Sequence, residues 1–252
     1  MTFNVRYPEK RDGADRWELR RDILLRVIQQ KNPDVIGTQE LFYIQGQYIV
    51  GNLPDYVWTG NSRRGNREDE HMGVFYKRGK LRAIESGNFW LSDTPEVAGS
   101  QSWGASLPRM VTWALFEITA TGQRFYFFNT HFHHTGDGNV ARVNSAKLIA
   151  SRVAALPAGV PFVLTGDFNA QAPESDPYKV LTADLKDSRL TAARKLGQEG
   201  TWSGFKGDTA ARRIDWILYR APWTVLEHET VTYNEDGRYP SDHYPVMAVF
   251  EY

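Results

Sequence analysis

The sequence predicts a layered α/β fold in which antiparallel sheets combine with helices. Two observations support this prediction. Short apolar runs of strand length recur along the 252 residues, and turn residues join some of them into hairpins. Two longer segments carry apolar residues at helical spacing, and 41% of all residues are hydrophobic, which is enough for a sizeable core. Hairpins mixed with long helices argue against a pure β-sandwich and against a strict βαβ repeat.

The first third of the chain alternates strands with helices. Residues 2–5 are strand-like, and a helix is expected from an N-cap at Asp15 to a stop at Asn32 and Pro33. A buried strand at 34–37 and a second helix, which begins near Leu41, follow. Residues 60–70 are too charged to pack and predict a loop. This loop leads into strands at 73–76 and 81–91, which we expect to form a hairpin around 77–80.

The remaining elements follow the same logic. A second hairpin is expected between 111–119 and 124–130, with Gly122 in the turn. Apolar residues at helical spacing predict a helix over 140–156, which Pro157 and Gly159 close. The last expected elements are a strand at 160–165, a short helix at 176–185, and strands at 214–219, 225–233 and 245–250.

Composition excludes several function classes. Thirty Lys plus Arg balance thirty Asp plus Glu, so any attraction for phosphate is local, which disfavours a protein that tracks duplex nucleic acid. Without cysteine there is no disulfide, no thiolate nucleophile and no Cys-type zinc site. Metal ligands are therefore expected to be oxygen or imidazole. No apolar stretch approaches the roughly 18 residues of a membrane-spanning helix.

The chain shows no internal repeat or linker, so we expect one catalytic domain over residues 1–252, acting as a monomer. No charged and then apolar leader precedes Thr2, which favours the cytoplasm. A precursor trimmed before export would give the same sequence.

Polar residues repeatedly follow apolar, strand-like runs. Burying an unpaired carboxylate costs several kcal/mol, so such groups usually meet partners or a metal. Each alone has a plain alternative: Asx residues form turns, a lone histidine lies at a core rim, and Asp215 pairs with a neighbouring arginine. Together they indicate one site for a hard divalent cation and two imidazoles. The residues are Asn4, Glu40, His131, Asp167, Asn169, Asp215, Asp242 and His243.

In chain order these segments resemble the endonuclease/exonuclease/phosphatase superfamily, which has the deoxyribonuclease-I-like fold, and in particular its small bacterial metal-dependent hydrolases. The resemblance covers essentially the whole chain. It implies a four-layered α/β sandwich, in which two packed, mainly antiparallel sheets carry helices on their outer faces. It also implies cleavage of a phosphoester with Mg²⁺ or Mn²⁺. The matching segments are 3–5, 39–40, 129–131, 166–169, 213–215 and 241–243.

The resemblance implies a metal site of oxygen ligands. Glu40 is expected to be the first ligand, because Mg²⁺ keeps several waters and needs only one or two protein carboxylates. Asn4 and Asp242 are expected to complete or orient the shell, although Asp242 alone also fits a turn.

The resemblance also implies the catalytic roles. Asp167 would orient the attacking water and accept its proton, and Asn169 would donate to a nonbridging phosphate oxygen. His243 would lie against the phosphate, with Asp215 holding its other nitrogen. His131 would be the second imidazole. Glu70 is a candidate partner for it, and solvation in an acidic loop is the alternative.

Several further residues keep two interpretations. Arg109 either clamps a phosphate as a substrate-binding residue or forms a rim salt bridge. Trp90 and Trp103 either stack on a substrate or belong to the core. The arginines at 63, 64 and 67 form either a solvated loop or a phosphate-binding patch. His133 stands where many relatives carry aspartate, which puts a two-metal mechanism in doubt.

The expected function is therefore a divalent-metal-dependent phosphohydrolase that acts by in-line water attack. Neutral net charge favours a small phosphomonoester or diester such as a sugar phosphate. The alternatives are a nuclease for single-stranded RNA or DNA and a non-catalytic ligand-binding protein on the same fold. A serine hydrolase elbow, a Walker loop and a zincin motif are all absent from the sequence.

Overall fold

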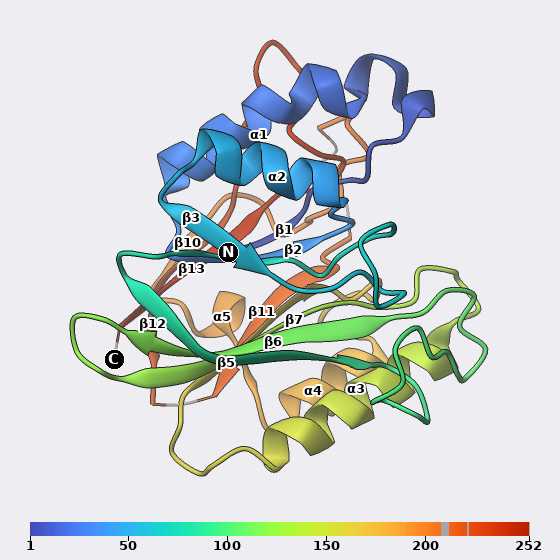
Figure 1. Cartoon of the computed structure of the whole chain (residues 1–252), viewed down its shortest axis with the longest axis vertical. Helices are drawn as coiled ribbons and strands as arrows, with labels where there is room; N and C mark the ends of the chain where they lie inside the picture. The colour runs from blue at the N-terminus through green and yellow to red at the C-terminus, as the bar shows by residue number, and fades with distance from the viewer. Residues whose placement is uncertain (208–211, 221, 252) are drawn as a thin grey trace.

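Two β-sheets packed face to face form the centre of the molecule (Figure 1). The computed structural model describes residues 1–207, 212–220 and 222–251. The seven-stranded sheet has the order β10 (Arg194–Leu196), β12 (Thr224–Thr230), β13 (Val246–Glu251), β1 (Thr2–Asn4), β2 (Val35–Gln39), β4 (Val74–Lys77) and β3 (Tyr56–Thr59). The six-stranded sheet has the order β5 (Leu81–Trp90), β6 (Met110–Ile118), β7 (Arg124–His131), β8 (Phe162–Asp167), β11 (Asp215–Arg220) and β9 (Lys186–Asp187).

Helices cover the outer faces of both sheets. In Figure 1, α1 (Trp17–Lys31) and α2 (Tyr43–Asn52) lie over the seven-stranded sheet, whereas α3 (Asn139–Ala154) and α4 (Asp176–Thr182) lie over the six-stranded sheet. The short η1 (Lys10–Asp15) and α5 (Ser188–Thr191) complete the helices of the described residues. Most neighbouring strands are antiparallel, while β1–β2, β7–β8 and β10–β12 are parallel. The expected four-layered sandwich is confirmed.

The central strands of the six-stranded sheet read as nearly continuous apolar runs because both of their faces are buried. Successive side chains of a strand point to opposite faces. Phe127, Val163 and Ile217 therefore face the interior between the sheets. Phe128 and Leu164, one residue further along, pack toward α3 and α4. This double burial explains why the strand ends are held rigidly beside the core.

A buried asparagine ties the two sheets together. The Asn129 amide nitrogen donates to the Thr38 carbonyl at 2.7 Å, and its Oδ1 accepts from Gln39 Nε2 at 2.6 Å. Gly37 lies opposite, where an added Cβ would stand 2.2 Å from Thr165 Oγ1. The sheets approach closely here because position 37 has no side chain.

Some local predictions were wrong. The expected hairpin of 73–76 and 81–91 does not form, because β4 joins one sheet and β5 the other. Asp15 does not cap α1, since it ends η1 and the N-cap is Arg16. The strands β3, β9 and β10 were not predicted. The second hairpin and the helix near 140–156 are confirmed as β6–β7 and α3.

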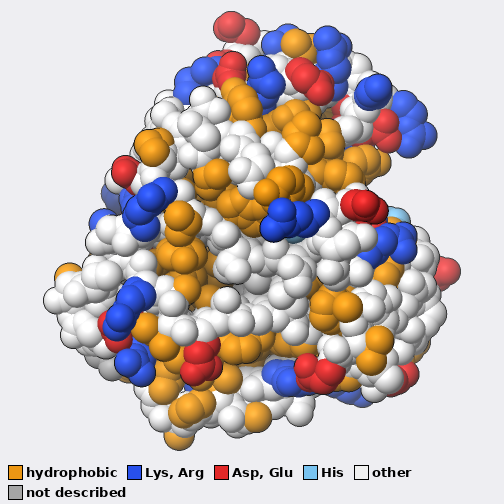
Figure 2. Space-filling view, viewed as in Figure 1, with side chains coloured by type: hydrophobic (Ala, Val, Ile, Leu, Met, Phe, Trp, Pro, Cys, Tyr) orange, Lys and Arg blue, Asp and Glu red, His pale blue; other side chains and the backbone are white. Residues whose placement is uncertain are grey.

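Surface properties agree with the neutral composition. Figure 2 shows Lys and Arg interspersed with Asp and Glu over the visible face, without a large area of one sign. Within the described ranges, no helix has the length and apolar character that crossing a bilayer requires.

Candidate active site

Strand directions bring the predicted polar residues to one edge of the sandwich. The parallel pairs β1–β2 and β7–β8 end side by side, which places Asn4 beside Gln39 and His131 beside Asp167. The antiparallel β11 begins where β8 ends, so Asp215 pairs with Asp167. His243 precedes β13, which is antiparallel to β1. Residues from both ends of the chain therefore meet because the sheet registers coincide.

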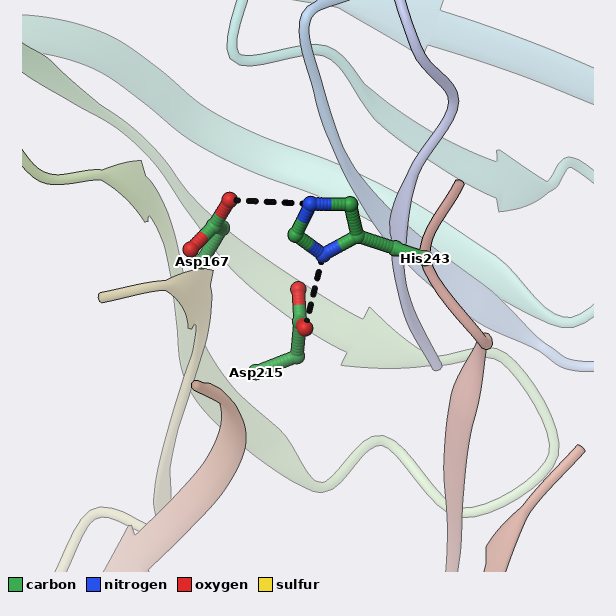
Figure 3. A group of neighbouring side chains, drawn as sticks. All are labelled: Asp167, Asp215 and His243. Atoms are coloured by element: carbon green, nitrogen blue, oxygen red, sulfur yellow. Dashed lines mark hydrogen bonds and ion pairs between the residues drawn. The ribbon is translucent and has the colours of Figure 1, made fainter. Parts of the chain in front are cut away.

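His243 lies between two carboxylates (Figure 3). Its Nδ1 is 2.9 Å from Asp215 Oδ2, and its Nε2 is 3.7 Å from Asp167 Oδ2. Thr201 Oγ1 donates to the same Asp215 oxygen at 2.6 Å and fixes its position. Burial alone would lower the pKa of His243, but the charges of Asp215 and Asp167 outweigh it and raise this pKa well above its usual value. His243 is therefore an imidazolium.

His131 has the opposite electrostatic setting. Burial and the positive charges of Arg109 and His243 lower the pKa of His131 well below its usual value, so the ring is neutral. Its Nε2 lies 3.0 Å from Asn169 Nδ2, and its Nδ1 lies 3.9 Å from Glu70 Oε2. Glu70 is buried beside His131 rather than solvated in its loop. The site thus holds two imidazoles in different protonation states.

Asp167 is the most enclosed carboxylate of the site, with 1% of its surface exposed. Asn4 Nδ2 donates to its Oδ2 at 3.0 Å, and the backbone N–H of Asn169 donates to its Oδ1 at 3.0 Å. Burial and the Asp215 charge raise the pKa of Asp167 to about 6. Both oxygens are held in place, so the carboxylate is positioned before any substrate binds.

Glu40 and Asp242 form a second acidic pair, and their side chains are 14% and 15% exposed. Burial, and next the charge of Asp242, raise the pKa of Glu40. Arg6 lies 3.9 Å from Glu40 and 4.0 Å from Asp242. Asn4 Nδ2 donates to Glu40 at 3.2 Å, while its Oδ1 accepts the Arg6 backbone N–H. In this arrangement Asn4 links Glu40 to Asp167 and directs its nitrogen, not its oxygen, at the carboxylates.

This donor set fits Mg²⁺ or Mn²⁺. Two neighbouring carboxylates with partial exposure offer hard oxygen ligands and leave room for waters. Asp167, Asp215 and His243 also have ligand atoms within 4.8 Å of one another. However, an imidazolium that holds protons toward two carboxylates has no free lone pair for a metal. The Glu40 and Asp242 pair is therefore the better candidate.

Arg109 is buried near His131, whose pKa its charge helps to lower, with 4% of its surface exposed. Its Nη2 donates to His134 Nδ1 at 3.1 Å, whereas its Nε and Nη1 have no hydrogen-bond partner among the described residues. A buried guanidinium with unpaired donors is costly unless a ligand supplies acceptors. Its position favours substrate binding over a rim salt bridge.

The other ambiguous residues also have definite places. Trp90 is buried and donates to the Arg63 carbonyl, and Trp103 packs against the core while donating to Asp93. Arg63 is buried with Asp69 and Glu70 as ion-pair partners at 3.0 and 2.9 Å. His133 turns toward Thr135, 2.6 Å away. Trp90 is therefore not free to form a stacking platform, whereas Trp103 is partly exposed.

Sequence reasoning missed Arg6, Thr201 and His134. Arg6 and His134 stand within two or three residues of predicted site residues, which is the signal that would have found them. Thr201 precedes Asp215 by 14 residues, and only the fold brings its hydroxyl to that carboxylate.

A cavity of about 500 Å³ lies away from the candidate active site. Its walls include Val35, Leu81, Phe125 and Phe250, which stand at the opposite ends of their strands from the candidate site. None of the predicted catalytic residues lines it. The candidate active site therefore stays at the strand ends, where the predicted polar residues meet.

Comparison with known proteins identifies the family. The model of the endonuclease/exonuclease/phosphatase family matches residues 1–243, so the chain belongs to that family. Its members are hydrolases of phosphoester bonds and generally depend on divalent metal ions.

Two solved structures are similar over nearly their whole length. A family member from Bacteroides vulgatus is 33% identical, with a TM-score of 0.93, over 99% of this chain and 97% of that chain. A mannosyl-6-phosphatase from Bacteroides thetaiotaomicron is 32% identical, with a TM-score of 0.92, over 100% and 98%. Nocturnin from Drosophila melanogaster is 23% identical over 98% of this chain and 43% of its own length. The chain spans 59% of the length of one curated relative, an uncharacterized protein of Acanthamoeba polyphaga mimivirus, and 43% of the length of Nocturnin.

Proposed function

We propose that this chain is a single-domain, monomeric phosphohydrolase that needs Mg²⁺ or Mn²⁺ and acts on a small phosphoester such as a sugar phosphate. The observation that carries the proposal is the convergence of two imidazoles on buried carboxylates: His243 lies 2.9 Å from Asp215 and 3.7 Å from Asp167, and His131 lies 3.4 Å from Asp167. The pKa values of the two rings are shifted in opposite directions, which is typical of acid and base assignments.

In this proposal each residue of the candidate site has its own role. Asp167 orients the attacking water and accepts its proton, since Asn4 and Asn169 hold both carboxylate oxygens. The His243 imidazolium and the Asn169 amide donate to nonbridging phosphoryl oxygens. Asp215 keeps the His243 ring oriented and charged.

The neutral His131 ring lies on the same side as Asp167, with its Nε2 3.4 Å from Asp167 Oδ2, and donates its N–H to a phosphoryl oxygen. Arg109 supplies its two unpaired donors to the phosphate. Glu40 and Asp242, with Asn4 as their orienting neighbour, would hold the metal ion. When bound there, the ion would supply positive charge to polarise the phosphoryl oxygens and stabilise the leaving oxygen.

Three facts support a small substrate. The net charge is zero, the reacting groups are almost fully buried, and a 32% identical relative is a mannosyl-6-phosphatase. A recessed centre accepts a terminal phosphate more easily than an internal phosphate of a duplex, which also needs a basic surface.

A substrate panel tests the proposal. It contains sugar phosphates, simple phosphodiesters, single-stranded RNA and plasmid DNA, each with Mg²⁺, with Mn²⁺ and with EDTA. We expect turnover of sugar phosphates that EDTA and the Asp167→Ala substitution abolish. Activity that persists in either control contradicts the mechanism. Faster cleavage of RNA or nicking of plasmid contradicts the substrate class and supports a nuclease.

A further inference from the structure

A second pocket, of about 330 Å³, lies at the β3 edge of the seven-stranded sheet. Tyr43 and Gln47 reach it from α2, Trp58 from β3 and Asn88 from β5. We call it the Tyr43 pocket. None of the residues assigned to catalysis or metal binding lines it.

The Tyr43 pocket is separated from the catalytic centre by one extended segment. Consecutive residues of such a segment point to opposite sides. Glu70 therefore faces His131, while His71 faces the pocket. The backbone N–H of His71 donates to the Leu41 carbonyl at 2.7 Å and closes the wall between the two spaces.

Aromatic rings line the pocket at an angle to each other. The Trp58 ring meets Tyr43 at 52° and His71 at 73°, with centroids 5.9 and 5.4 Å apart. Phe75 already stacks on Trp58 at 19°, and the Arg67 guanidinium lies 5.0 Å from the centre of the Tyr43 ring. The rings therefore form no parallel-sided slot that would sandwich a flat base.

Carboxamides supply the polar part of the pocket. Asn88 Oδ1 accepts from Thr112 Oγ1 at 2.9 Å, which leaves its Nδ2 group to donate. The side chains of Gln47 and Asn61 make no hydrogen bond within the described part of the chain, so both can donate and accept. Arg67 is the one charged lining residue, and it already has an aromatic partner.

We propose that the Tyr43 pocket is a binding site for a neutral sugar ring. A pyranose presents several hydroxyls that pair with carboxamides. The volume, the mostly polar exposed lining and the three carboxamides match that chemistry. The site binds with or without a phosphate in the catalytic centre.

Titration of the whole protein with methyl pyranosides, followed by NMR of the tryptophan indole signals, tests this site. We expect saturable binding of at least one pyranoside. Gln47→Ala and Asn88→Ala should each weaken it about tenfold, since each loses a hydrogen bond to a hydroxyl. Gln30→Ala, an exposed glutamine on α1, is the matched control and should leave the affinity unchanged.

The catalytic assay separates this site from the proposed function. Asp167→Ala should bind the pyranoside as the wild type does, whatever its activity, and Gln47→Ala should keep kcat on a sugar monophosphate. Three results would each overturn the proposal: no saturable binding up to about 100 mM (Kd weaker than the millimolar range), binding unaffected by both pocket substitutions, or preferential binding of a nucleoside.

Discussion

Replacing Asp215 with asparagine removes the charge that faces His243 while it keeps the shape of the side chain. Asp215 Oδ2 lies 2.9 Å from His243 Nδ1 and accepts from Thr201 at 2.6 Å. In the variant an amide takes this place, so the ring loses both its fixed orientation and one of its two counter-charges.

The distances set the size of the effect. At an effective dielectric constant of about 20, a charge pair at 2.9 Å is worth about 6 kcal/mol, and one at 3.7 Å about 4.5 kcal/mol. Asp167 keeps the second interaction in the variant. Only the part that strengthens in the transition state affects kcat. We therefore expect kcat to fall about 10²- to 10³-fold, or about 3–4 kcal/mol.

The assay compares kcat of Asp215→Asn and Asp187→Asn with the wild type, using the best phosphoester of the panel at saturating Mg²⁺. Asp187 is an equally buried carboxylate, 2.7 Å from Arg213 and outside the candidate site. Both variants should lose thermal stability, because each leaves a buried partner unpaired, but only Asp215→Asn should lose kcat. A kcat within about threefold of wild type, or an equal loss in Asp187→Asn, refutes the reasoning.

Three further predictions concern the metal site, packing and pH. Glu40→Gln should weaken Mg²⁺ binding at least about tenfold in calorimetric titration, and unchanged affinity would remove Glu40 from the metal site. Gly37→Ala should destabilise the fold by about 1–3 kcal/mol in urea unfolding, because the added Cβ would meet Thr165. Gly51→Ala should instead stabilise the fold by up to about 1 kcal/mol, because Gly51 lies in a helix and its Cβ would meet no neighbouring atom. Burial lowers the pKa of His228 to about 3, so as the pH falls the unfolded chain takes up the proton before the folded chain does. The free energy of unfolding should therefore decline below about pH 6.5, by up to about 1.4 kcal/mol per pH unit. An equal decline in His228→Gln would exclude this residue as the cause.

Local chemistry and periodicity in the sequence were enough to predict the fold class and the candidate site residues. The layered class followed from hairpins beside long helices, and the candidate residues followed from polar groups such as Asp167 that end apolar runs. A polar group that is buried at a strand end needs a partner in any tertiary arrangement, so its presence after an apolar run already indicates a site. Such signals predicted the candidate residues, which the fold brings together at one edge of the sandwich.

Long-range neighbours decided the rest. Consecutive strands β4 and β5 look like a hairpin, yet pairing partners distant in sequence draw them into different sheets. His131 and His243 are the same residue type, but burial beside Arg109 keeps one neutral while Asp215 and Asp167 charge the other. The Tyr43 pocket unites residues from a helix, two separate strands and the segment 60–71. The amino-acid order specifies which groups are present, whereas charge state and contact depend on distances that only the folded chain sets.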